Sequence, residues 1–296
     1  MAFERVLMRH PNVPESLEGW SILHRMFRFD RRRYDALDAR ARTALESDAL
    51  ELLAELARAP QADVALAQIL GHKADVMLTH YAASFEALAD AEMRVDKCAL
   101  REFLEPVGSY VSMLELGLYD ATGKIHGDLR ERGLKPYSDE WNTAFDAALA
   151  DQARSPRNAS RLWAKIPRRR YACFYPMDKK RGESINWYML PYEERAALML
   201  DHGKIGRSFH GLVTQVISGS IGFDDWEWGV DLYADDPLVF KKLIYEMRFD
   251  EASARYAAFG PFYTGLQFSI AQLPQFLRGD GVAALVAQDV PEAVAP

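Results

Sequence analysis

The segment Ala74-Asp-Val-Met-Leu-Thr-His-Tyr81 resembles a second segment that begins 154 positions later, Trp228-Gly-Val-Asp-Leu-Tyr-Ala-Asp235. This repeat continues with the tripeptide Glu-Met-Arg, which stands at 92–94 and again at 246–248. In each copy the apolar run predicts a strand, and the tripeptide belongs to the amphipathic helix that follows. Because the offset is about half of the 296 residues, the pattern predicts a duplicated α+β unit, with a helical layer on an antiparallel sheet in each half.

The other expected elements follow the same order of helices and strands on both sides. In the first half we expect helices at 44–58, ending before Pro60, and at 84–93, and extended segments at 73–81 and 109–116. In the second half we expect strands at 184–190, 211–218 and 226–233, a helix from Pro191 that stops at Gly203, and a helix that Pro237 opens.

The connection between the halves is polar and rich in glycine and proline, which predicts a connecting loop or lid over residues 122–160. We therefore expect an N-terminal subdomain over 1–121 and a C-terminal subdomain over 161–278. The Ala/Val-rich end of the chain, 279–296, reads as a dispensable tail.

Composition narrows the class of protein. The net charge of −7 argues against nucleic acid or an anionic membrane as partner, although arginine runs stand at 31–33 and 168–170. Cys98 and Cys173 lie far apart and the N-terminus lacks an apolar signal core, so we expect a cytoplasmic protein without disulfides. No apolar run approaches the ~20 residues that span a bilayer.

Two stretches of the second half have residue types suited to chemistry. His202 ends an amphipathic run beside Gly203 and Gly206, an arrangement that suits a haem iron ligand, although a helix-capping histidine is the commoner case. The segment 175–181, Tyr-Pro-Met-Asp-Lys-Lys-Arg, sets a phenol beside a proton donor, or forms a solvated basic turn. Gln215 lies in an apolar strand and faces either solvent or a pocket. The acidic residues at 224–227 and 235–236 read as turns without chemistry, and no histidine or cysteine pair has zinc spacing.

Taken together, five strings of the second half resemble the chlorite dismutase-like haem protein superfamily, specifically its coproheme decarboxylase branch. They are Tyr175-Pro-Met-Asp-Lys-Lys-Arg181, Asn186-Trp-Tyr-Met-Leu-Pro-Tyr-Glu-Glu-Arg195, His202-Gly-Lys-Ile-Gly-Arg207, Asp224-Asp-Trp-Glu-Trp-Gly229 and Tyr245-Glu-Met-Arg-Phe-Asp-Glu-Ala-Ser-Ala-Arg-Tyr256. The first half matches more loosely, through 13–20 and 73–75, so the resemblance covers about residues 10–275.

The resemblance implies two ferredoxin-like subdomains of the dimeric α/β barrel type, homopentameric assembly, and an iron porphyrin bound in the C-terminal half. By position, His202 is then the proximal iron ligand, Tyr175 the redox-active tyrosine and Lys179 its proton donor. Gln215 falls where chlorite-degrading members carry a distal arginine, a departure that speaks against chlorite decomposition. The remaining positions would hold propionates, at Arg161, Arg207, Arg248 and Ser253, or line the pocket, at Met177 and Trp187.

The function so implied is oxidative decarboxylation of two propionates of iron coproporphyrin III (coproheme) to vinyl groups, with hydrogen peroxide as oxidant, haem b as product and a tyrosine radical as relay. Transient contact with the iron-inserting enzyme of the same pathway is a further expectation. Two alternatives stay open: a peroxidase-like or haem-carrying relative that does not decarboxylate, and, more distantly, a nucleic-acid-binding module that uses the arginine runs. An absorption spectrum with added coproheme separates the latter from the haem proteins.

Overall fold

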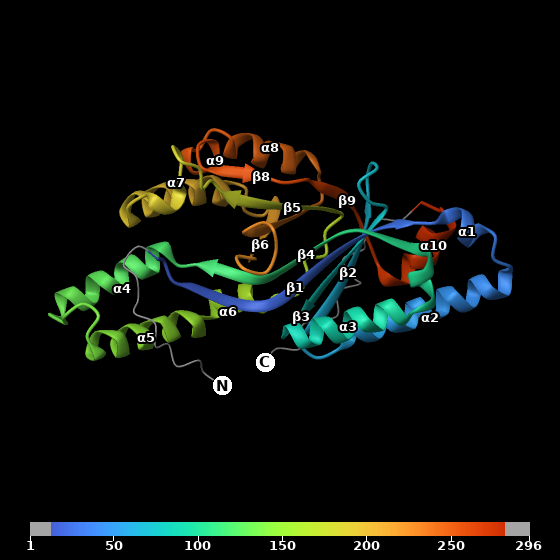
Figure 1. Cartoon of the computed structure of the whole chain (residues 1–296), viewed down its shortest axis with the longest axis horizontal. Helices are drawn as coiled ribbons and strands as arrows, with labels where there is room; N and C mark the ends of the chain where they lie inside the picture. The colour runs from blue at the N-terminus through green and yellow to red at the C-terminus, as the bar shows by residue number, and fades with distance from the viewer. Residues whose placement is uncertain (1–12, 282–296) are drawn as a thin grey trace.

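The strands form a closed antiparallel barrel in the computed structural model, which describes residues 13–281 (Figure 1). Neighbouring strands follow the order β7-β6-β4-β1-β3-β2-β9-β5, and pairing of β5 with β7 closes the ring; β8 adds to the far end of β5. The strands are β1 Ser16–Phe29, β2 Ala62–Ile69, β3 Val76–Ala82, β4 Leu104–Gly117, β5 Tyr171–Lys179, β6 Val213–Gly219, β7 Trp228–Ala234, β8 Ala257–Phe259 and β9 Tyr263–Phe268.

The duplication predicted from the repeat is confirmed by the topology. The first half runs β1-α2-β2-β3-α3-β4 and the second β5-α7-β6-β7-α8-β9, and each half orders its strands fourth-first-third-second, the ferredoxin-like pattern. The repeated segments are β3 with α3 and β7 with α8. The helices of these units are α2 Ala39–Arg58, α3 Phe85–Lys97, α7 Tyr192–Ser208 and α8 Leu238–Met247.

Short helices complete the structure: α1 Arg31–Asp35, η1 Ala99–Phe103, η2 Trp187–Met189, α9 Glu251–Ala254, η3 Ile270–Gln272 and α10 Leu273–Arg278. Most expected elements occur within a few residues of their predicted ends, and α2 stops at Arg58, before Pro60. The strands β1, β2, β5, β8 and β9 were not predicted. Among the helices of residues 13–281, none is both long and apolar enough to cross a bilayer.

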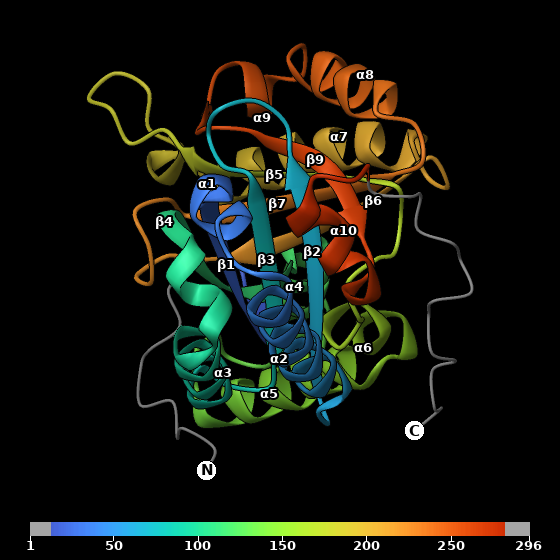
Figure 2. The same ribbon diagram turned by 90° about the vertical axis from the view of Figure 1, so that its right-hand side faces the viewer.

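Strand alternation divides the core into a barrel interior and two outer layers. On β5, Phe174 packs inside the barrel with Met26 and Tyr110, whereas its neighbours Cys173 and Tyr175 pack outside, under α8. Figure 2 shows α7 and α8 above β5 and β7, well away from α2 and α3, which cover the strands of the first half. The two halves therefore offer two separate spaces between helix and sheet.

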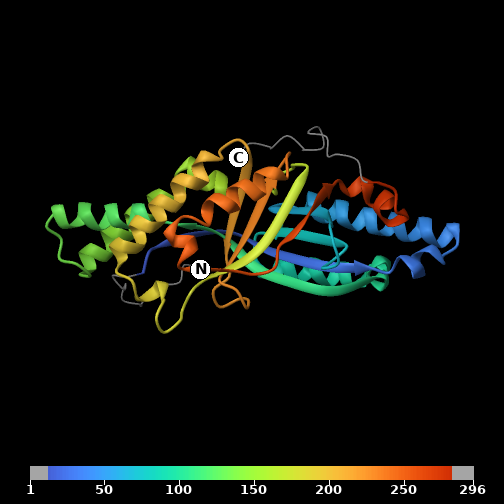
Figure 3. The same ribbon diagram turned by 90° about the horizontal axis from the view of Figure 1, so that it is seen from above.

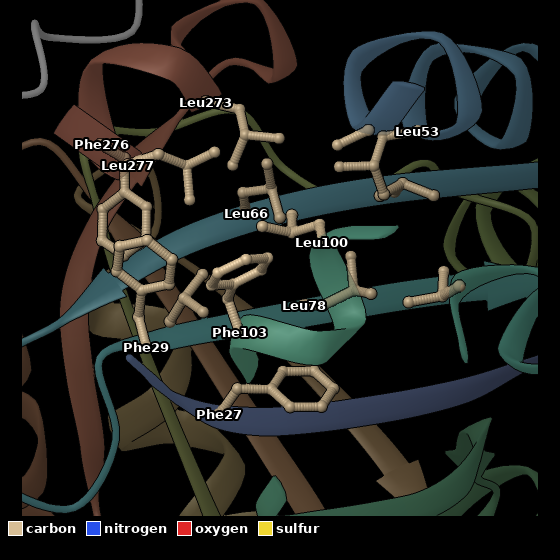
Figure 4. Close-up of a cluster of buried hydrophobic side chains, with 14 of the residues drawn as sticks. Phe27, Phe29, Leu53, Leu66, Leu78, Leu100, Phe103, Leu273, Phe276 and Leu277 are labelled. Atoms are coloured by element: carbon tan, nitrogen blue, oxygen red, sulfur yellow. The ribbon is translucent and has the colours of Figure 1, made fainter. Parts of the chain in front are cut away.

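The outer layer of the first half is filled by aliphatic and aromatic side chains. Phe27, Leu53, Leu66, Leu78 and Phe276 converge there from β1, α2, β2, β3 and α10 (Figure 4). The cavity left among them measures about 40 Å³, well below the ~150 Å³ that accommodates benzene. A large flat ligand is therefore excluded from this layer of the described structure.

Three sequence-based expectations are wrong. Residues 184–190 contain the single turn η2, Trp187–Met189, rather than a strand, because β5 already pairs with β7 on one edge and with β9 and β8 on the other. Asn186 starts this turn by accepting a hydrogen bond from the Tyr188 amide, 3.0 Å. Helix α7 passes through Gly203 and Gly206 to Ser208, and the left-handed glycine that ends this region is Gly211, φ 82°.

The third correction concerns residues 122–160, which form helices rather than a loop: α4 Tyr119–Glu131, α5 Asp139–Arg154 and α6 Pro156–Leu162. Ile125, Leu129, Trp141 and Phe145 bury one another at helical spacing, and that pattern outweighs the glycines and prolines. In Figures 1 and 3 α4 and α5 extend from one end of the barrel. The subdomain boundaries stay predictions, and of the tail only residues 279–281 lie within the described range.

Candidate functional site

The outer layer of the second half lies between β5–β7 and the helices α7, α8 and α9. Every second residue of β5 faces it, so that Tyr175, Met177 and Lys179 line up along one face of the strand. Helix α7 brings His202 and Arg207 from above, and α9 with its cap adds Ser253. The fold thus gathers residues that the sequence separates by up to 78 positions, from 175 to 253.

Tyr175 is almost completely buried, at 4% exposure. Its ring stacks on Phe262 with centroids 4.4 Å apart and lies 5.9 Å from Phe259. Burial raises the pKa of this phenol well above its ordinary value, the nearby Cys173 adds to the rise, and Arg248 opposes it. The hydroxyl therefore stays protonated at neutral pH and is available as a hydrogen donor.

Lys179 is a buried cation at the end of the same strand. Its Nζ donates a hydrogen bond to the Ala252 carbonyl, 2.8 Å, and lies 4.3 Å from the centre of the Trp187 ring. Burial lowers the pKa of Lys179 to about 8, against the opposing influence of Asp250 and Glu227. A lysine with this pKa releases and regains a proton near neutral pH, as a general acid must.

His202 is held by a carboxylate that the sequence did not indicate. Its Nδ1 lies 3.1 Å from Asp250 Oδ2 and 3.4 Å from Ser253 Oγ. When Nδ1–H donates its hydrogen bond to Asp250, Nε2 carries the lone pair that can bind a metal. The two acidic residues next to this pair in the sequence bond elsewhere, Glu251 with Arg255 and Asp201 with Lys204.

Gln215 faces α7 from β6 rather than solvent. Its Nε2 donates to the carbonyl of Gly206, 3.2 Å, one helical turn beyond His202. A Cβ added to Gly206 would stand 3.4 Å from that amide nitrogen. Gln215 thus belongs to the same layer as the histidine.

The candidate cations are not all gathered. Arg248 lies over the ring of Phe259 at 3.9 Å, on the Tyr175 side of the layer, and Arg207 is exposed on α7. Arg161 stands apart on α6, which packs against β1 and β4, and no contact with the histidine or the tyrosine is recorded for it among residues 13–281. The layer therefore has two of the three predicted arginines.

Helix α7 packs only loosely on its sheet, so the layer can be asked to admit a flat ligand. Of its seventeen residues only Arg195 is buried, whereas its counterpart α2 buries five of twenty. Met177, Ile205 and Ile217 face the layer only half-buried. Apolar side chains that face a sheet normally pack fully, so a large planar group would complete this layer. A histidine with a free Nε2 and arginines at the rim suit an iron porphyrin with acidic side chains.

Comparisons with known proteins agree with this geometry. The sequence profile of the family Chlorite dismutase matches residues 42–268. A coproheme decarboxylase of Staphylococcus saprophyticus is 43% identical over 86% of this chain and 94% of its own length. A protein of Haloquadratum walsbyi, named as haem-binding, is 38% identical over 94% of this chain, which spans about half (49%) of that relative. The solved haem-binding protein of Thermus thermophilus superposes with a TM-score of 0.77 at 39% identity, covering 91% of this chain and 99% of that one.

Proposed function

The chain belongs to the chlorite dismutase family, and from that premise we propose that it is a coproheme decarboxylase. It would convert two propionates of iron coproporphyrin III to vinyl groups and release haem b. The observation that carries the proposal is the pair Tyr175 and Lys179, a buried neutral phenol and a buried lysine of pKa about 8 on one face of β5, in the layer that contains His202. A protein that only stores haem needs no such pair.

Different residues of this layer would contact the iron, the propionates and the ring of the porphyrin. His202 would bind iron through Nε2, with Asp250 fixing the ring through Nδ1. Arg207 and Arg248 would pair with propionates, and Met177 and Trp187 would line the ring. Ser253 lies against the imidazole and so would orient the histidine at least as much as a propionate. Arg161 would reach a propionate only if α6 approached the layer.

The reaction balances with one peroxide per propionate: –CH2CH2COO⁻, hydrogen peroxide and one proton give –CH=CH2, carbon dioxide and two waters. The bound iron porphyrin supplies the oxidising chemistry with hydrogen peroxide. Tyr175 would act as the relay by giving up an electron and its phenol proton toward the oxidant and then taking a hydrogen atom from the propionate, and its burial keeps water from the reacting group. Lys179 would supply the proton that the balance requires.

Two alternatives lose support. Gln215 is a neutral amide, so it cannot attract an anionic oxidant as a guanidinium does, which argues against chlorite decomposition. One arginine of each run is bonded within the fold: Arg31 donates to the Leu277 carbonyl, 2.6 Å, and Arg168 pairs with Asp63, 2.5 Å. The net charge of −7 also argues against nucleic acid as the partner.

The test combines binding with product analysis. The purified protein is titrated with coproheme, and binding is monitored by the visible absorption spectrum. The complex is then treated with hydrogen peroxide, and the mass of the extracted porphyrin is measured by mass spectrometry. We expect loss of two carboxyl groups with two equivalents of peroxide. Tight binding with all four propionates retained would instead indicate the peroxidase-like or haem-carrying alternative.

Assembly as a homopentamer, a cytoplasmic location and transient contact with the iron-inserting enzyme are also proposed, on the strength of the resemblance. Light scattering of the purified protein tests the first of these. A mass corresponding to one chain of 33.6 kDa would contradict it.

Asp250→Asn is expected to weaken the bond between His202 and iron, because an amide accepts the Nδ1 proton less strongly than a carboxylate. The iron–histidine stretching frequency of the ferrous complex should fall, and iron porphyrin should dissociate about tenfold faster. Glu251→Gln, which removes a neighbouring exposed carboxylate paired with Arg255, serves as the control. An unchanged frequency in Asp250→Asn would show that this carboxylate does not act on the ligand.

A further inference from the structure

Glu227 is a buried carboxylate, 6% exposed, in the turn that leads into β7. Its Oε2 accepts a hydrogen bond from the main-chain amide of Lys179, 2.9 Å, and its own amide donates to Asp178 Oδ1, 2.7 Å. The acidic residues at 224–227 were expected to form a turn without chemistry. The fold instead places this one against the strand that carries the proposed relay.

Two side chains near the surface anchor the carboxylate. Arg181 approaches with Nε 3.4 Å from Oε1, and the Tyr188 hydroxyl donates to Glu227, which together with burial raises the pKa of that phenol. Arg181 is largely exposed and Tyr188 partly so. Glu227 is therefore held at a fixed place between the lysine and the surface.

The groups that face Lys179 come from three elements. Asp250 faces it from the cap of α9, Glu227 from the turn before β7, and the neutral ring of Trp187 from η2. On its own strand, Asp178 accepts a hydrogen bond from the Glu227 amide, and just beyond the strand Arg181 pairs with the Glu227 carboxylate. Asp250 is already shared, since Oδ2 bonds His202 and Oδ1 accepts the Ser253 amide, 3.0 Å. Of the two carboxylates that face Lys179, Glu227 is thus the one bonded directly to it, through the main-chain amide, and Asp250 the one bonded to His202.

We propose that Glu227 is a positioning residue that fixes the main chain of Lys179 and keeps its buried side chain charged. The proposal deepens the proposed function and rests on it for the role of Lys179. It differs from a purely structural role, in which Glu227 only joins β5 to β7. A structural tie affects stability, whereas a positioning role also changes the protonation of a second residue.

The test uses ligand-free protein carrying ¹³C-labelled lysine, with the Lys179 signal assigned by its loss in Lys179→Arg. Removing a nearby negative charge destabilises the ammonium form, so Lys179 should titrate at lower pH in Glu227→Gln than in the wild type. Glu251→Gln removes the same charge from an exposed neighbour and should leave the midpoint unchanged. Equal midpoints in wild type and Glu227→Gln, or equal shifts in both variants, would overturn the proposal.

A second measurement needs no change at position 227 and covers the case in which Glu227→Gln does not fold. Arg181→Gln leaves Glu227 in place and removes the exposed cation beside its Oε1, so a rise in the pH at which the Lys179 signal titrates is expected. The absence of this rise contradicts the proposal.

Activity gives the third readout. The alkaline limb of the pH–rate profile with coproheme and peroxide should move to lower pH in Glu227→Gln but not in Glu251→Gln. If neither the wild type nor the variants convert coproheme, the proposed function fails. The lysine titration still decides whether Glu227 affects the protonation of Lys179.

Discussion

Tyr175→Phe is expected to abolish decarboxylation while coproheme binding stays within about twofold of the wild type. The change removes only the hydroxyl, so the ring keeps its stacking on Phe262, 4.4 Å away, and the layer keeps its shape. The hydroxyl is the one group of Tyr175 that can give up a proton and an electron. Loss of a proton-transferring group costs about 10²–10⁴-fold in rate, and loss of the relay itself should reduce turnover to background.

The measurement pairs a coproheme binding titration with mass spectrometry of the porphyrin after peroxide addition. Tyr171→Phe is the matched control, since Tyr171 lies on the same face of β5, four residues earlier, beside Arg170. It should retain full turnover. Normal activity in Tyr175→Phe would remove the proposed relay, and loss of binding would mean that the hydroxyl holds the substrate instead.

Gly265→Ala is expected to destabilise the fold by about 3 kcal/mol, the upper end of what overpacking usually costs. Gly265 lies in β9 opposite Ile69 of β2 and Ala172 of β5, at the seam where the two halves join. A Cβ there would stand 2.0 Å from the Gln68 carbonyl oxygen and 3.0 Å from the Ile69 Cα. Both atoms belong to the main chain, so the strands would have to separate to admit it.

Urea unfolding followed by tryptophan fluorescence measures the loss. Gly117→Ala is the control: it changes another strand glycine, at the end of β4, whose added Cβ would meet no atom within 4 Å. We expect that variant to stay within about 1 kcal/mol of the wild type. If the two variants unfold at the same urea concentration, the close approach of β2 and β9 does not constrain the fold.

The sequence singled out side chains that the fold brings together, and it predicted the connections of the fold less well. His202, Tyr175, Lys179 and Gln215 were all singled out, and the structure brings them into one layer, although their roles stay proposals. Asp250 and Glu227 were missed because an isolated acidic residue in a turn is nearly always solvated, and nothing local distinguishes one that the fold buries. The only cue was Asp250-Glu-Ala-Ser253, a helix-capping pattern, and it indicates a cap rather than a histidine partner.

The same limit explains the errors along the chain. Residues 184–190 have strand composition, but a strand also needs a free edge, and β5 has none. Glycines at 203 and 206 weaken a helix, yet α7 continues because neither adopts a left-handed conformation. Arg161 matches a family position, while its place on α6 is set by how α4–α6 pack.

What the sequence determined by itself was the repeat, because each unit's strand and helix patterns are local and recur at one offset, together with the identity of the groups able to do chemistry. Only the tertiary structure decided that the two units close into a single barrel, that the first unit's outer layer is filled, and which carboxylates serve His202 and Lys179. These are outcomes of strand pairing and burial between residues far apart in the chain: Asp250 lies 48 positions from His202, and Glu227 lies 48 from Lys179. Local patterns do not encode such contacts, because their free energy arises only when the second element is already in place.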